Sequence, residues 1–190
     1  MAGDEERRRT FEATFRDHYQ AVLAYALARA DPDMAKDAAA GAFLVAWRRR
    51  GELPEQPLPW LLGVTRKILA DQRRSRDRQT SLARRLASEP EAAENAPDPA
   101  EEICDLGAAD AALGTLRPAD QELLRLVAWE GLTNAEIAVV LGCPRSLIGV
   151  RLHRARQRFR AALQARDTAS PVTRQELAIR TPHPITVEDR

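Results

Sequence analysis

Hydrophobic residues in the first part of the chain recur at steps of three and four positions, which is the period of an amphipathic α-helix. The first such segment starts at Thr10, and its apolar positions are Phe11, Phe15, Tyr19, Val22, Leu23, Ala26 and Leu27. Asp31-Pro32-Asp33 interrupts the pattern and supplies an N-cap, so a second helix is predicted over about Met34–Arg49. Prolines make residues 51–59 a stiff loop, and a third helix is predicted from Trp60.

The second half of the chain repeats the helical pattern after a stretch rich in Glu, Ala and Pro. Scarcely any large apolar side chain occurs between Ser88 and Glu101, so this stretch is predicted to be a solvated linker. The helices predicted after it are Asp105–Thr115, Pro118–Glu130, Asn134–Leu141 and Arg145–Ala165.

These elements predict an all-α protein with two small helical domains. The expected parts are an N-terminal helical bundle (10–86), an acidic flexible linker (87–104), a C-terminal four-helix domain with a helix-turn-helix (105–166) and a mostly disordered tail (167–190). A chain of 190 residues with 44% hydrophobic content suits two small cores better than one large core.

Charge is unevenly distributed, although the net charge is only +1. Residues 66–85 are rich in Arg, and residues 145–160 contain six Arg and no acid. Between the two blocks, residues 89–110 hold eight acids and no Lys or Arg. Two basic blocks of this kind favour a polyanionic partner.

The sharpest local signal is a helix-turn-helix pattern over residues 131–148. Thr133 and Glu136 are spaced as a capping box, Ala138 is small where a second helix must cross, and Gly142 can adopt a left-handed turn. Ile137, Leu141, Ile148 and Leu152 are predicted to pack between the two helices. The second helix, from Arg145, has the size and charge to enter a major groove. A helical hairpin whose arginines are only solvated is the alternative.

Other function classes lack the residues that they need. Cys104 and Cys143 have no CxxC spacing and no nearby His, so neither a metal site nor a cofactor is expected, and both are expected to be reduced thiols in a cytoplasmic protein. No apolar run approaches the ~20 residues that span a membrane. The three His residues are scattered, and no nucleophile and base share a motif, so neither catalysis nor a small-molecule substrate is expected.

Two regions of the chain resemble one known family. Residues 113–124 and 130–156 closely resemble the C-terminal domain of the extracytoplasmic-function group of bacterial sigma-70 factors, which reads the minus-thirty-five promoter element. Residues 37–47 and 59–67 resemble the domain of that family that binds the polymerase clamp and the minus-ten element. The resemblance implies a sigma factor whose partners are core RNA polymerase and promoter DNA. Family members are often held by an anti-sigma protein, and no residue identifies one here.

The resemblance also implies roles for particular residues. In the C-terminal domain, DNA is expected at Thr133, Arg145, Ser146, Leu147, Gly149, Val150, Arg151, His153, Arg154 and Arg156. In the N-terminal domain, a flipped base and its strand are expected at Glu52, Leu53, Glu55, Gln56, Trp60, Arg66, Lys67, Arg73 and Arg74. Polymerase is expected at Asp37, Ala40, Gly41, Leu44 and Arg48. Trp47 and Trp60 lie in apolar stripes, which favours a place in the core. The acidic linker is expected either to thread the polymerase channels or to be a plain spacer.

Two departures from the family pattern change these expectations. Ala40-Gly41 replaces a common Gln-Glu pair, so polymerase attachment is expected to rest on neighbours such as Asp37 and Arg48. In the recognition helix, Leu147, Gly149 and Val150 replace residues that hydrogen-bond, which predicts an unusual or relaxed minus-thirty-five preference.

Two rival interpretations use the same residues. A helix-turn-helix regulator of the response-regulator output type shares the second domain but does not account for residues 43–47 and 59–67. An adaptor that occupies polymerase without firing promoters is the other rival, which Ala40-Gly41 makes plausible.

Overall fold

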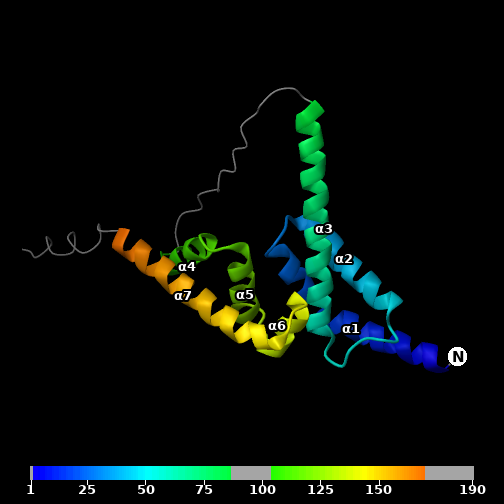
Figure 1. The fold of residues 1–190 in the computed structure, drawn as a ribbon. Helices are drawn as coiled ribbons and strands as arrows, with labels where there is room; N and C mark the ends of the chain where they lie inside the picture. The colour runs from blue at the N-terminus through cyan, green and yellow to red at the C-terminus, as the bar shows by residue number, and fades with distance from the viewer. Residues whose placement is uncertain (1, 87–103, 170–190) are drawn as a thin grey trace, which may run out of the picture. The chain divides into compact units, whose positions relative to one another are not determined.

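The computed structural model describes residues 2–86 and 104–169, and every regular element within these ranges is an α-helix (Figure 1). The helices are α1 (Ala2–Leu27), α2 (Pro32–Arg48), α3 (Pro57–Leu86), α4 (Cys104–Gly114), α5 (Pro118–Ala128), α6 (Asn134–Leu141) and α7 (Arg145–Ala169). The predicted all-α class is therefore confirmed. The predicted linker (87–104) and tail (167–190) lie almost entirely outside the described residues.

Two helices begin earlier than the hydrophobic pattern predicted. Helix α1 starts at Ala2 rather than Thr10, where Asp4 and Glu5 occupy the first turn and suit its positive dipole end. Arg8 pairs with Glu5 at 3.0 Å, one turn away on the same helix. Helix α3 starts at Pro57 rather than Trp60, because proline fits the first turn of a helix, where its missing N–H is not needed.

The described helices form two compact units. The first contains α1, α2, α3 and Arg125–Arg151, and the second contains α4, the part of α5 up to Leu124 and the part of α7 from Leu152. This division cuts through α5 and α7, so it does not follow the predicted domain limits of 10–86 and 105–166. Those limits stay a prediction.

Helix α2 packs between α1 and α3 in the first unit through an inner face made largely of alanine. Its fully buried alanines are Ala35, Ala38, Ala39, Ala42 and Ala46. Gly41 extends this face of small residues, because a Cβ built on it would lie 3.1 Å from Cδ1 of Ile68 in α3. Gly41 thus lies where α2 and α3 approach each other.

Aromatic rings fill the seam between α1 and α2. Phe15 meets Phe43 edge-on with ring centroids 4.8 Å apart, and Phe11 meets Trp47 in the same way at 5.1 Å. Arg50 lies over the ring of Trp47, with its guanidinium carbon 4.5 Å from the ring centroid. These contacts leave Trp47 37% exposed. The expectation that Trp47 belongs to the core is therefore wrong, and Trp60 is only half-buried.

Helix α6 also packs against α3 within the first unit. A Cβ on Gly63 would lie 3.4 Å from the Cα of Val140, so the two backbones approach closely there. Arg29 and Glu130 form an ion pair of 3.0 Å in the same unit, and both side chains are largely buried. A Cβ at position 63 would thus just touch the backbone of α6, so α3 and α6 lie close together there.

Candidate nucleic-acid interface

The helix-turn-helix begins at the capping box that the sequence predicted. The backbone N–H of Thr133 donates to Oε2 of Glu136 at 2.7 Å, and the hydroxyl of Thr133 accepts from the backbone N–H of Glu136 at 3.4 Å. Hydrogen bonds from the Thr133 hydroxyl and then from its backbone N–H lower the pKa of Glu136. The start of α6 is thus fixed by two neighbouring residues.

The turn between α6 and α7 depends on Gly142. This residue has φ 64° and ψ 40°, in the left-handed region that a side chain makes costly. The backbone N–H of Gly142 donates to the carbonyl of Val139 at 3.2 Å, and that of Cys143 donates to the carbonyl of Ala138 at 3.1 Å. The left-handed glycine predicted for this turn is confirmed, and it redirects the chain into α7 within three residues, 142–144.

One face of α7 is buried along its first three turns. Ile148 and Ala155 are fully buried, and Leu152 between them is 6% exposed. Their spacing of four and three residues forms a single stripe along the helix. Of the residues predicted to pack at the helix-turn-helix, Ile137, Ile148 and Leu152 are buried, whereas Leu141 is only half-buried.

The rest of the surface of α7 carries every residue of that helix that was predicted to contact DNA. All of them are exposed: Arg145, Ser146, Leu147, Gly149, Val150, Arg151, His153, Arg154 and Arg156. Thr133, the predicted contact before α6, is exposed as well. No Asp or Glu occurs from Arg145 to Arg166. The result is a cationic helix surface next to a tight turn, although contact of these residues with DNA stays a prediction.

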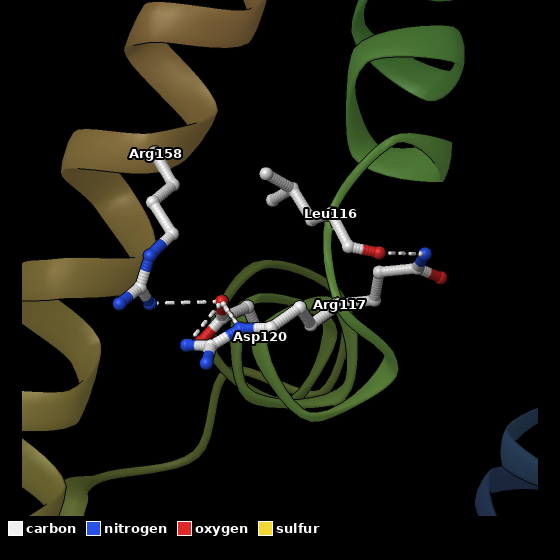
Figure 2. Close-up of polar contacts among 5 residues, drawn as sticks. Leu116, Arg117, Asp120 and Arg158 are labelled. Atoms are coloured by element: carbon white, nitrogen blue, oxygen red, sulfur yellow. Dashed lines mark hydrogen bonds and ion pairs between the residues drawn. The ribbon is translucent and has the colours of Figure 1, made fainter.

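An ion-pair cluster that sequence reasoning missed fastens α7 in the second unit. Figure 2 shows Arg117 and Arg158 both pointing at the carboxylate of Asp120. Nη1 of Arg158 lies 2.9 Å from Oδ2 of Asp120, and Nη2 of Arg117 lies 3.2 Å from the same oxygen. Asp120 is almost fully buried in the first turn of α5. Arg158, which the charge pattern placed with the basic helix face, therefore ties α7 to α5.

Gln121 closes the turn before α5. Its side-chain amide donates to the carbonyl of Leu116 at 2.8 Å (Figure 2) and to that of Gly114 at 3.2 Å. These two carbonyls lie at and just after the end of α4, where helical partners are missing. The polar contacts around Asp120 and Gln121 thus hold together α4, α5 and α7 within the second unit.

The residues predicted to hold DNA in the N-terminal part divide into two groups. Glu52, Glu55 and Gln56 are exposed in the loop before α3, and Leu53 is half-buried there. Arg66 and Lys67 are exposed on α3. Two further cations make contacts within the protein, because Arg73 donates to the carbonyl of Arg29 and Arg74 pairs with Asp71. Their role at a DNA strand stays a prediction.

The residues predicted to contact polymerase form a stripe on α2. Asp37, Ala40, Leu44 and Arg48 are exposed at spacings of three or four residues, so they share one helix face, and Gly41 is half-buried beside them. Leu44 is 50% exposed. This stripe is the outer side of the helix whose inner side is lined with alanine.

Among the described residues, no group of His, Cys, Asp and Glu is placed to hold a metal ion. The helices of residues 2–86 and 104–169 include none with the length and apolar character needed to cross a membrane.

Comparison with known proteins identifies the helix-turn-helix. Residues 106–159 match the family described as sigma-70, region 4. The chain is also 35% identical over 156 residues to a probable RNA polymerase sigma factor, RfaY, of Xanthomonas campestris pv. campestris. That match covers 76% of this chain and 38% of the relative, so the chain spans about two fifths of the relative's length.

Two solved structures share the fold. The sigma factor RpoE of Bartonella quintana, solved with the anti-sigma factor NepR, has 23% identity and a TM-score of 0.60, and the match covers 81% of this chain and 96% of that one. CnrH, solved with the cytosolic domain of CnrY, has 24% identity and a TM-score of 0.52, with 83% and 90% covered. The helix-turn-helix is a domain of the sigma-70 region 4 type. The resemblance to the sigma-70 family is thus borne out over residues 106–159, and the relative that matches 76% of the chain is also a probable sigma factor.

Proposed function

We propose that the chain binds core RNA polymerase and directs it to promoter DNA, and that it catalyses no reaction itself. The observation that carries this proposal is the coincidence, over residues 145–156, of an exposed acid-free helix face with the matched sigma-70 region 4. A cationic helix after a tight turn has the shape and charge to enter the major groove of DNA. In this proposal, α7 contacts the minus-thirty-five element.

In this proposal, the N-terminal part binds both the polymerase and the minus-ten element. The exposed stripe of α2, from Asp37 to Arg48, binds the polymerase clamp. The loop at 51–56 and the exposed cations Arg66 and Lys67 of α3 hold the minus-ten strand, since a flipped base requires polar edges and nearby positive charge. Two separate contacts with one DNA molecule define the promoter better than either contact alone.

The partners in this proposal are core RNA polymerase and promoter DNA, in the cytoplasm and without a cofactor. An anti-sigma protein is a further partner, because both solved structures that share the fold are complexes, one of them with a named anti-sigma factor.

Run-off transcription with purified core polymerase tests the proposal. Core polymerase with the chain is expected to start at a defined site on a promoter of the native genome, and core polymerase alone is not. Arg48→Ala should weaken assembly with the polymerase, whereas Arg154→Ala should weaken promoter binding after assembly. A helix-turn-helix regulator would bind DNA without directing the polymerase, and an adaptor would bind the polymerase without a start site, so either result contradicts the proposal.

A further inference from the structure

Two apolar side chains stand out on the exposed face of α7. Leu147 is 50% exposed and Val150 is 54% exposed, although the apolar residues between and beside them, Ile148 and Leu152, are buried. Leu147 and Val150 lie one turn apart, so their side chains are neighbours on the helix surface. An exposed apolar pair on this helix is suited to an apolar feature on a partner.

The position of Val150 on the helix decides what it can reach. Successive residues of an α-helix turn by about 100°, so Val150 and Ser146, four residues earlier, point away from the buried stripe of Ile148 and Leu152. Gly149, next to Val150, adds no side chain, and a Cβ built there would meet nothing within 4 Å. Val150 therefore lies at the crest of the helix, where the groove floor comes closest.

The surroundings of the pair favour DNA over an apolar protein surface. Arg151 and Arg154 are exposed beside Leu147 and Val150, and the first turn of the helix has no acid to balance them. A cationic rim around an apolar crest complements a polyanion that offers apolar groups inside a groove. In the major groove of DNA, the 5-methyl group of thymine is the apolar feature of the base edges.

We infer that Leu147 and Val150 read thymine methyl groups in the upstream promoter element. This inference rests on the proposed function and deepens it, because it names the groups that this recognition helix selects. A methyl packed against Leu147 or Val150 leaves water, which stabilises the complex. A G·C pair at the same place would bring polar edges against a side chain that cannot hydrogen-bond, which selects against that pair. Specificity at this position thus arises from attraction to thymine and from rejection of G·C.

Deoxyuridine scanning tests the inference, since it removes only the 5-methyl group from a thymine. The polymerase assembled with the full chain is bound to a promoter found by run-off transcription, and each thymine of the upstream element is replaced in turn. One or two replacements should weaken binding by about fourfold, as expected for one buried methyl. In Val150→Ala or Leu147→Ala, the matching thymine should lose its effect, so that thymine and deoxyuridine bind equally.

Val139→Ala is the matched control, because Val139 on α6 is also a valine with 54% of its surface exposed. It should leave the deoxyuridine profile unchanged. The three positions are exposed, so alanine in a helix should not unfold the protein. The inference is overturned if no thymine of the upstream element is sensitive, or if the sensitivity survives in both Leu147→Ala and Val150→Ala. Absence of any promoter in the run-off step is a different result, which contradicts the proposed function itself.

Discussion

The outer faces of α2 and α7 each expose a leucine to the same extent, and they differ in the charges around it. Leu44 of α2 and Leu147 of α7 are both 50% exposed. Leu44 lies in a stripe that contains the acid Asp37 and the base Arg48, whereas Leu147 lies among arginines without any acid. Mixed charge around an apolar centre suits a protein partner, and uniform positive charge suits a phosphate backbone. Charge, rather than apolar exposure, therefore distinguishes the two surfaces.

The inner faces of the two helices differ as well. Helix α2 buries alanines such as Ala38 and Ala42, which let it lie close between α1 and α3. Helix α7 buries Ile148 and Leu152, and Arg158 further along ties it to Asp120. Helix α7 thus depends on a few large side chains and an ion-pair cluster, so single substitutions should affect it strongly.

The largest expected effect comes from the buried stripe of α7. Ile148→Ala removes a fully buried side chain and should lower the free energy of unfolding by about 2–5 kcal/mol. The neighbouring Leu147→Ala is the control, and it should change stability by at most about 0.5 kcal/mol, because Leu147 is half-exposed. Urea denaturation followed by circular dichroism measures both. Equal losses in the two variants would show that α7 does not bury the face described here.

A smaller loss is expected at the ion-pair cluster. Asp120→Asn leaves Arg117 and Arg158 without their shared carboxylate and should cost about 1–2 kcal/mol. Hydrogen exchange should speed up in α7 and stay unchanged in α2. Asp110→Asn, at an exposed acid of α4, is the control and should leave both helices unchanged. Faster exchange in α2 to the same degree would contradict a local role for Asp120.

The contrast in charge predicts different responses to salt. Arg154→Ala should lower the slope of log affinity against log salt by about 1, because one phosphate contact fewer releases fewer counterions. Arg48→Ala should leave this slope unchanged and weaken binding to core polymerase instead. Promoter binding by the assembled polymerase, titrated over a range of salt concentrations, measures the slope. An unchanged slope in Arg154→Ala would remove this residue from the DNA interface.

The smallest effect concerns the cap of α6. The folded pKa of Glu136 is lowered by its hydrogen bonds to Thr133, so its contribution to stability is present above its unfolded pKa, about 4.3, and is lost as pH falls through the folded value. Thr133→Ala should cost about 1 kcal/mol at neutral pH. The stability difference between the native chain and Glu136→Gln should shrink as pH falls below about 4.3.

Denaturation midpoints between pH 7 and pH 3 measure this change. Glu55→Gln, at an exposed carboxylate in the loop before α3, is the control and should follow the native profile closely. A constant difference between the native chain and Glu136→Gln over the whole pH range would contradict the capping role of Glu136.

The sequence predicted best what neighbouring residues determine. The start of α6 depends on Thr133 and Glu136, and its end depends on Gly142, so a window of ten residues contains the whole signal. The exposed and buried faces of α7 followed from the helical period, whereas Leu141 at the end of α6 was predicted to pack and is only half-buried. These predictions succeeded because local rules and the final packing agree at the helix-turn-helix.

Features that depend on distant residues were missed. Arg158 and Asp120 are separated by 38 positions, and no local rule pairs them. Nothing in the sequence around Gly41 indicates that Ile68 of α3 lies beside it. Trp47 lies in an apolar stripe, but the helical period does not predict that the residues packed around Trp47 leave part of its ring exposed. The early start of α1 was missed because residues 4–9 are all charged and give no hydrophobic period.

Photocrosslinking from the two matched leucines tests the central claim most directly. A photoreactive residue is placed at Leu44 in one variant and at Leu147 in another, and each is assembled with core polymerase on a promoter. The account predicts a crosslink from position 44 to a polymerase subunit and a crosslink from position 147 to DNA upstream of the start site. Crosslinks from both positions to protein alone, or from position 44 to DNA and position 147 to polymerase, would contradict it.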